Sequence, residues 1–163
     1  MSYIDMIKDR ARLDKKTIVL PESNDKRTLI AAAKIMEEKI ALAACSGMSP
    51  NGLVARVAVH DLAIDDVEIL SICMGSTSAN VTGFKRMLDK YPILAINGCE
   101  GNCVGKILEQ KGIEIVDELN VGDILAETDH KANDAARLDE EGEICVSIVK
   151  EVIENKIKEI ELD

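Results

Sequence analysis

The stretch IALAACSGMSP, residues 40–50, decides the fold, because an apolar run passes through a cysteine and a glycine into a strong helix start. Residues 40–44 are too short and too apolar a run for a half-exposed strand, which predicts a buried strand of a parallel sheet. Ser49 can cap a helix that begins at Pro50, since proline there lacks only an N–H that would be unpaired anyway. We therefore expect a strand, a loop that carries Cys45, and a helix to about residue 63.

The same order of elements recurs along the chain. Further apolar runs predict strands at Val67–Ile72, Ile93–Ile96 and Ile113–Val116. The segments between and after them predict a polar loop at 76–80, helices at 81–89 and 102–110, a turn or short helix at 121–129, a surface loop at 133–142 and a long helix at 144–160. Upstream, we expect helices at 1–13 and about 24–39 around a short strand at 17–20. Alternating strands and helices predict right-handed crossovers. The expected fold class is α/β, a three-layer, Rossmann-like arrangement of a mostly parallel sheet with helices on both faces.

Length and charge limit the function. The 163 residues suit one domain, and the near absence of aromatic residues (no Trp, two Tyr, one Phe) suits aliphatic helices packed on a sheet. No apolar stretch approaches the ~20 residues of a membrane span, and the first 20 residues lack an apolar centre for secretion, so we expect a cytoplasmic protein.

The net charge of −10 is concentrated in residues 113–163, which hold five basic and sixteen acidic residues. An acidic surface without a basic, aromatic stripe argues against nucleic-acid binding. The acidic third is interpreted as a solvated face, with a protein-docking surface as the alternative, and a homo-oligomer stays open.

Four cysteines stand where predicted strands end. Cys45 and Cys73 follow two of the apolar runs, and Cys99 and Cys103 follow a third. Because parallel strands end at one edge of a sheet, these thiols should lie along that edge, where α/β folds bind ligands. Four thiolates suit zinc or an iron–sulfur cluster. The alternatives are that these cysteines are reactive thiols that bind no metal, or small apolar residues buried in the core. Cys145, which lies far along the chain, is interpreted as a core residue.

Whether the chain is an enzyme stays undecided at this level. Four thiolates would close a zinc site and make it structural or regulatory, whereas three would leave a position open for catalysis or thiol handling. The loops at 45–49 and 75–78 precede helices and are rich in small polar residues, so anion binding is an alternative to ordinary helix capping. His60 and His130, the two histidines, are interpreted as structural rather than as ligands.

Residues from about 40 to 125 resemble the DGC-domain family, which is named for an Asp-Gly-Cys motif. The matching residues are Cys45–Ser49, Gly52, Ala55-Arg56, Cys73 and Asn97–Cys103. The resemblance implies metal binding, with zinc expected, by four cysteines, here Cys45, Cys73, Cys99 and Cys103. This chain departs from the motif at Asn97, which replaces the aspartate and leaves all four thiols in place.

Residues 1 to about 40 are similar to the beginning of phosphate acetyltransferase. The similar stretches are Ile7-Lys8, Arg10-Ala11, Lys15–Glu22, Asp25–Leu29 and Ala31–Ala33. The substrate-binding residues of that enzyme lie downstream of this segment, so acetyl transfer is not expected here. We accordingly divide the predicted single domain, 1–163, into an acetyltransferase-like segment (1–40), a cysteine-bearing core (40–125) and an acidic loop with a C-terminal helix (126–163).

Overall fold

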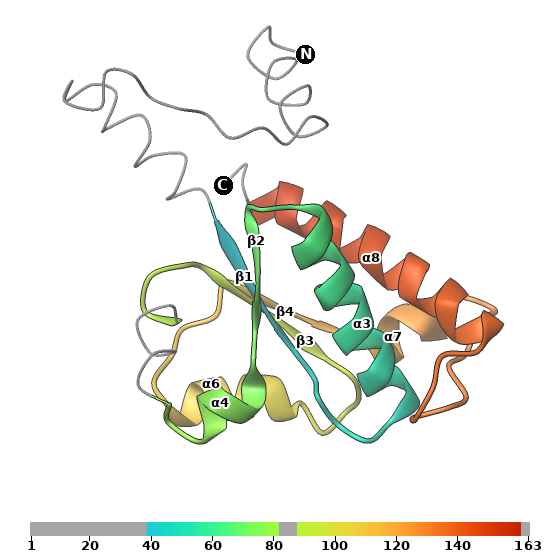
Figure 1. Ribbon diagram of the computed structural model, residues 1–163, viewed down its shortest axis with the longest axis horizontal. Coiled ribbons are helices and arrows are strands. Elements are labelled where there is room, and N and C mark those ends of the chain that lie inside the picture. The colour runs from blue at the N-terminus through green and yellow to red at the C-terminus, as the bar shows by residue number, and fades with distance from the viewer. Residues whose placement is uncertain (1–38, 82–87, 161–163) are drawn as a thin grey trace, which may run out of the picture. The chain divides into compact units, whose positions relative to one another are not determined.

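The computed structural model describes residues 39–81 and 88–160, which form a parallel sheet with helices around it (Figure 1). The chain divides into two units, residues 1–38 and 39–163, and the account below concerns the second. The predicted elements at 1–13, 17–20 and 24–39 lie outside the described residues, as does most of the helix predicted at 81–89. The division into one domain or several stays a prediction.

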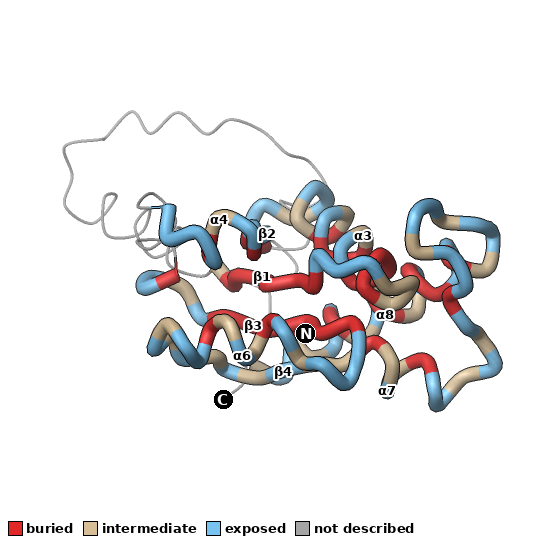
Figure 2. Tube along the Cα trace, turned by 90° about the horizontal axis from the view of Figure 1, so that it is seen from below, coloured by how far each residue is buried: buried red, intermediate tan, exposed pale blue. Residues whose placement is uncertain are grey.

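Four parallel strands make the sheet in the order β2-β1-β3-β4. They are β1 (Ile40–Ala44), β2 (Ile69–Ile72), β3 (Ile93–Asn97) and β4 (Asp117–Asn120). The register pairs Leu42 with Ser71 on one side and with Leu94 on the other. Every residue of the two central strands is buried, as expected for parallel strands covered on both faces (Figure 2). The predicted α/β fold class is confirmed.

Helices follow each of the four strands along the chain. They are α3 (Pro50–Asp65), α4 (Met74–Ser78), α6 (Cys103–Gln110), α7 (Val121–Ala126) and α8 (Glu140–Ile160). The path from β1 to β2 and the path from β3 to β4 run in opposite directions across the sheet, which puts α3 and α6 on opposite faces. Figure 1 shows α3 and α8 side by side and α6 apart from both.

Local sequence explains the ends of these elements. Ser49 caps α3 by accepting a hydrogen bond from the backbone N–H of Gly52, and Pro50 opens the helix, as predicted. After α6, Gly112 takes a left-handed φ of 64°, which favours glycine and stops the helix. The long apolar face of α8 places Val149 and Ile153 in the core.

Several predicted elements differ in position or type. The long helix predicted at 144–160 begins at Glu140, inside the loop predicted at 133–142, where Oδ1 of Asp139 accepts a hydrogen bond from the backbone N–H of Gly142. The polar segment at 76–80 lies largely within α4, because Cys73 and its carbonyl oxygen hold the first turn of a short helix. The fourth strand is not Ile113–Val116 but the more polar Asp117–Asn120. An edge strand needs less apolar surface than a central one, and Ile113 and Ile115 pack half-buried against the core before that strand begins. Strand β2 begins at Ile69, two residues later than predicted. Val67, with 65% of its surface exposed, does not belong to the buried strand.

Candidate metal centre

The four cysteines singled out in the sequence all lie at the carboxyl edge of the sheet. Cys73 follows β2, Cys45 follows β1, and Cys99 lies two residues beyond β3, so they line the edge in strand order. Cys103 is the first residue of α6. The strand order reverses between β1 and β3, which is the point where open α/β sheets form ligand sites. Cys45 and Cys99 flank that point.

Cys45 is buried beneath the first turn of α3. Its Sγ accepts a hydrogen bond from the backbone N–H of Gly47 at 3.4 Å and lies 3.3 Å from where a Cβ on Gly52 would stand. The next loop also presses on this turn, because a Cβ on Gly98 would meet the Cα and N of Gly52 at 2.8 Å. The absence of a side chain at Gly98 therefore allows the loop that carries Cys99 to approach the helix above Cys45.

Cys99 and Cys103 are exposed neighbours. Their Sγ atoms lie 3.5 and 3.6 Å from the same point, the position that a Cβ on Gly101 would take. The turn between them is held from below by Asn97, whose Oδ1 accepts a hydrogen bond from the backbone N–H of Val104 at 3.1 Å. Both thiols are thus presented to solvent on a turn that is anchored in the core.

Cys73 occupies a different setting at the edge strand. Its exposed Sγ accepts a hydrogen bond from the backbone N–H of Ser76 at 3.5 Å and caps α4. Hydrogen bonds from the side chain and the backbone N–H of Ser76 lower the pKa of the Cys73 thiol below its ordinary value. Cys73 is therefore disposed to carry a thiolate, the form that binds metals.

The structure does not draw the four thiols together. Across residues 39–81 and 88–160, no three histidine, cysteine or acidic side chains lie close enough to hold a metal ion. The chemistry of the donor set suits zinc, which binds four cysteine sulfurs well, and the lowered pKa of Cys73 favours the thiolate form of that residue. Ligation by all four cysteines stays a prediction that concerns the metal-bound state.

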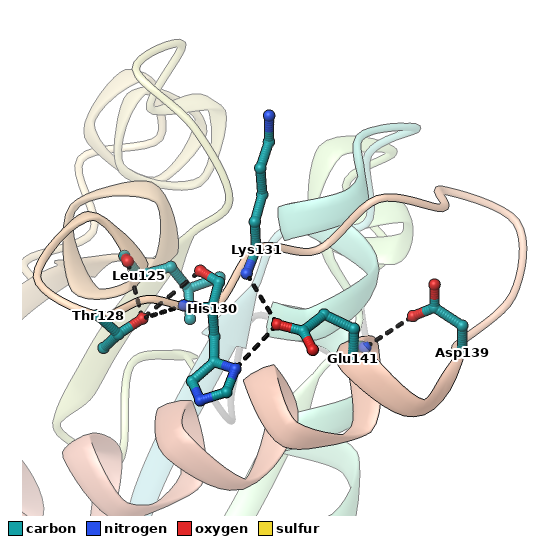
Figure 3. A network of polar contacts seen from close by, with 7 residues as sticks. Leu125, Thr128, His130, Lys131, Asp139 and Glu141 are labelled. Atoms are coloured by element: carbon teal, nitrogen blue, oxygen red, sulfur yellow. Dashed lines mark hydrogen bonds and ion pairs between the residues drawn. The ribbon is translucent and has the colours of Figure 1, made fainter.

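Cys145 and His130 have structural roles that are separate from the cysteine edge. Cys145 is fully buried in α8, and burial, followed by the nearby carboxylates of Glu141 and Asp139, raises the pKa of its thiol. The Nδ1 of His130 lies 2.8 Å from Oε1 of Glu141, which also accepts from the backbone N–H of Lys131 (Figure 3). These contacts tie the loop after α7 to the start of α8 and give His130 a structural role.

An asparagine network beneath the cysteine loops escaped the sequence reasoning. Asn97 is 1% exposed, and its Nδ2 donates to Oε2 of Glu118 at 3.4 Å. On the same side, the Nδ2 of Asn120 donates to Oδ1 of Asn102 at 3.1 Å, and Asn120 also caps α7. A polar residue that ends a wholly apolar run, as Asn97 does, is the signal that could have revealed this support.

Comparisons with known proteins give different results for the two parts of the chain. The N-terminal part matches the phosphate acetyltransferase of Acetivibrio thermocellus, with 54% identity over 41 residues. That match covers 25% of this chain and 12% of the enzyme, so it is a short, partial likeness. No solved structure matches the chain. A further search finds that no helix within the described residues is long and apolar enough to cross a bilayer.

The larger part of the chain gives a family match. A sequence model of the DGC domain matches residues 41–160, a range that runs from β1 to the end of α8 and contains all five cysteines. This chain belongs to the DGC-domain family.

Proposed function

We propose that this protein binds a zinc ion through Cys45, Cys73, Cys99 and Cys103. The observation that carries the proposal is their common place at the carboxyl edge of three neighbouring strands, on both sides of the point where strand order reverses. Membership of the DGC-domain family supports metal binding in general terms. Zinc as the metal and these four residues as its ligands are our own assignment.

Four thiolates would complete a tetrahedral zinc shell and leave no open position, which favours a structural or regulatory role. Without metal, thiols gain little by converging, since S–H groups are weak hydrogen-bond donors and thiolates repel one another. Metal binding would thus be coupled to a local rearrangement of the three loops. Because Cys73 and Cys103 begin helices, rotation about χ1 can re-aim their sulfurs without unfolding the sheet.

Metal analysis of protein purified without oxygen tests the proposal. We expect about one zinc per chain and no colour, because zinc has a filled d shell. Iron together with acid-labile sulfide and a brown absorption would assign the same cysteines to an iron–sulfur cluster instead. Protein without any bound metal, even after incubation with zinc, would contradict both assignments.

Single substitutions identify the ligands. We expect each of the four Cys→Ser variants at positions 45, 73, 99 and 103 to bind zinc at least tenfold more weakly, since a serine hydroxyl is a poor zinc ligand. The matched control is Cys145→Ser, which removes a thiol from the core of α8 and should leave zinc stoichiometry unchanged. Wild-type zinc affinity in all four edge variants would remove the tetrathiolate assignment.

A second candidate function is dithiol–disulfide exchange at Cys99 and Cys103. The exposed position of these two sulfurs around Gly101 favours it. The pair would give two electrons and two protons to a low-molecular-weight disulfide, forming one intramolecular disulfide and releasing two thiols. Incubation of metal-free protein with oxidised glutathione tests this: peptide mapping should recover a Cys99–Cys103 disulfide that dithiothreitol reverses. Mixed disulfides alone would contradict it.

The enzyme class beyond this candidate is not assigned. The 41-residue likeness to phosphate acetyltransferase gives no ground for proposing acetyl transfer, because it spans 12% of that enzyme.

A further inference from the structure

A pocket of about 390 Å³ opens between α3 and the end of β2, and the zinc proposal makes no use of its charged side chains. Arg56 and His60 line it from α3, Ile72 lines it from the end of β2, and Cys73 lines it from the start of α4. Arg56 and His60 are four residues apart on one helix, so their side chains lie on the same face. The pocket therefore places a guanidinium and an imidazole opposite the end of the edge strand.

The guanidinium of Arg56 has no acidic partner within residues 39–81 and 88–160, although the protein carries a net charge of −10. Further along α3, Asp61 and Asp65 instead contact the Nζ of Lys150 at 3.7 and 3.4 Å. An arginine that is left without a carboxylate on an acidic protein, and that faces a pocket, is a group available to an anion from solution.

The rest of the pocket limits the kind of anion. Ala44, Val57, Ile72 and Met74 supply apolar wall, and among the described residues that line the pocket Arg56 alone carries a permanent charge. The fork of a single arginine can pair with either a carboxylate or a phosphate, but one guanidinium balances the single charge of a carboxylate and leaves a phosphate dianion with an excess charge against an apolar wall. One N–H group at the start of each helix is already engaged, that of Gly52 by the side chain of Ser49 and that of Ser76 by Cys73, and is not available to an anion.

We propose that this pocket binds a small monocarboxylate with a short aliphatic body. The carboxylate pairs with Arg56 and receives a hydrogen bond from His60, and the aliphatic carbons lie against Val57 and Ile72. Since Cys73 lines the same pocket, the bound acid covers its thiol. This site differs from the proposed zinc site in its ligand and in the charged residues that bind the ligand. The two sites share Cys73, which lines the pocket and is also a proposed zinc ligand.

Butyrate is the probe for the first test. In titrations of the full, isotope-labelled chain followed by NMR, we expect saturable shifts of α3 and β2 amides with a millimolar dissociation constant, as befits a six-atom ligand. Arg56→Gln should weaken butyrate binding at least tenfold, and Arg137→Gln, at an exposed loop position, is the matched control. Binding that survives Arg56→Gln, or no saturable shift with the wild-type chain, would overturn the proposal.

Comparison of ligands separates carboxylate recognition from general anion binding. Butyrate should bind roughly tenfold more tightly than acetate, because its two additional methylenes bury apolar surface. Inorganic phosphate should bind more weakly than butyrate at equal ionic strength, and the opposite order would assign the pocket to phosphate compounds instead, contradicting the proposal.

Protection from alkylation supplies an independent readout. In metal-free protein, butyrate should slow iodoacetamide modification of Cys73 but not of Cys99, which lies outside the pocket lining. Equal slowing of both thiols, or of neither, would contradict the placement of the ligand. Zinc content measured on Arg56→Gln keeps the two proposals apart: we expect it unchanged, so loss of carboxylate binding with full zinc isolates the pocket.

Discussion

Restoring an aspartate at Asn97 should destabilise this protein, although the change is nearly isosteric. The Oδ1 of Asn97 accepts from the N–H of Val104, and its Nδ2 faces the carboxylate of Glu118 at 3.4 Å. Because the N–H of Val104 can only donate, the amide has one orientation that satisfies both contacts. A carboxylate at position 97 can still accept the hydrogen bond from the N–H of Val104. It has no N–H to donate to Glu118, so two hydrogen-bond acceptors would face each other there.

The loss of unfolding free energy can be estimated for each of the two protonation states of the introduced carboxyl group. Two ionised carboxylates 3.4 Å apart repel by about 5 kcal/mol at an effective dielectric constant near 20, and less here because Glu118 is exposed to solvent. Alternatively, the introduced group takes up a proton and donates to Glu118, which costs about 4 kcal/mol at pH 7 for an acid of ordinary pKa 3.9. The cheaper route prevails, so we expect Asn97→Asp to lower the free energy of unfolding by about 2–4 kcal/mol.

Urea unfolding at two pH values measures this loss and its sign. Burial and Glu118 raise the folded-state pKa of the introduced acid above its unfolded value, so the deficit is largest at pH 7 and shrinks as pH falls, to roughly 1.5 kcal/mol at pH 5. Asn102→Asp is the matched control: its Oδ1 only accepts, from Asn120, and we expect a change below about 1 kcal/mol. A loss under 1 kcal/mol at pH 7, or one independent of pH, would refute the reasoning.

Three further predictions concern packing and charge. Gly98→Ala should lose about 2 kcal/mol or more in urea unfolding, because the new Cβ would meet the backbone of Gly52 at 2.8 Å; an unchanged midpoint would contradict that contact. Cys145 should resist iodoacetamide in the folded, metal-free protein at pH 8 and react once urea unfolds it, because burial raises its pKa; rapid native labelling would place it outside the core. A hydrogen bond from Lys156 holds the pKa of Asp117 below its usual range, so Lys156→Met should cost a little thermal stability at pH 7. The cost should shrink as the pH falls below about 4 and through the lowered pKa of Asp117, where that carboxyl is protonated in both states; a loss that grows on acidification would reverse the sign.

The central part of the fold could be predicted because local pattern and global burial agree there. The apolar run that forms β1 is bounded by a cysteine loop and by the Ser49-Pro50 helix start, and each of these signals holds in the structure. The edge strand β4 could not be found in this way. Its residues, DELN, are polar, and pairing with β3 rather than apolar content makes them a strand.

The candidate site likewise has one feature that the sequence could predict and others that it could not. Strand ends are visible in sequence, and the carboxyl edge of a parallel sheet gathers them, so the common edge of the four cysteines could be predicted. The direction of each sulfur depends on contacts that only the fold supplies: Cys73 turns toward Ser76, and Cys45 lies beneath Gly52. The pocket lined by Arg56 was hidden for the same reason, since its walls come from the end of β1, from α3 and from the end of β2, which only the fold brings together.

The most direct test of the metal proposal is X-ray absorption at the zinc edge, on full-length protein purified without oxygen and carrying one zinc per chain. We expect a single shell of four sulfur atoms at about 2.3 Å. Cys145→Ser should leave this shell unchanged, whereas Cys73→Ser, where zinc remains bound, should replace one sulfur by a nitrogen or oxygen atom. A shell dominated by nitrogen and oxygen at about 2.0 Å in the unmodified protein would contradict ligation by the four edge cysteines.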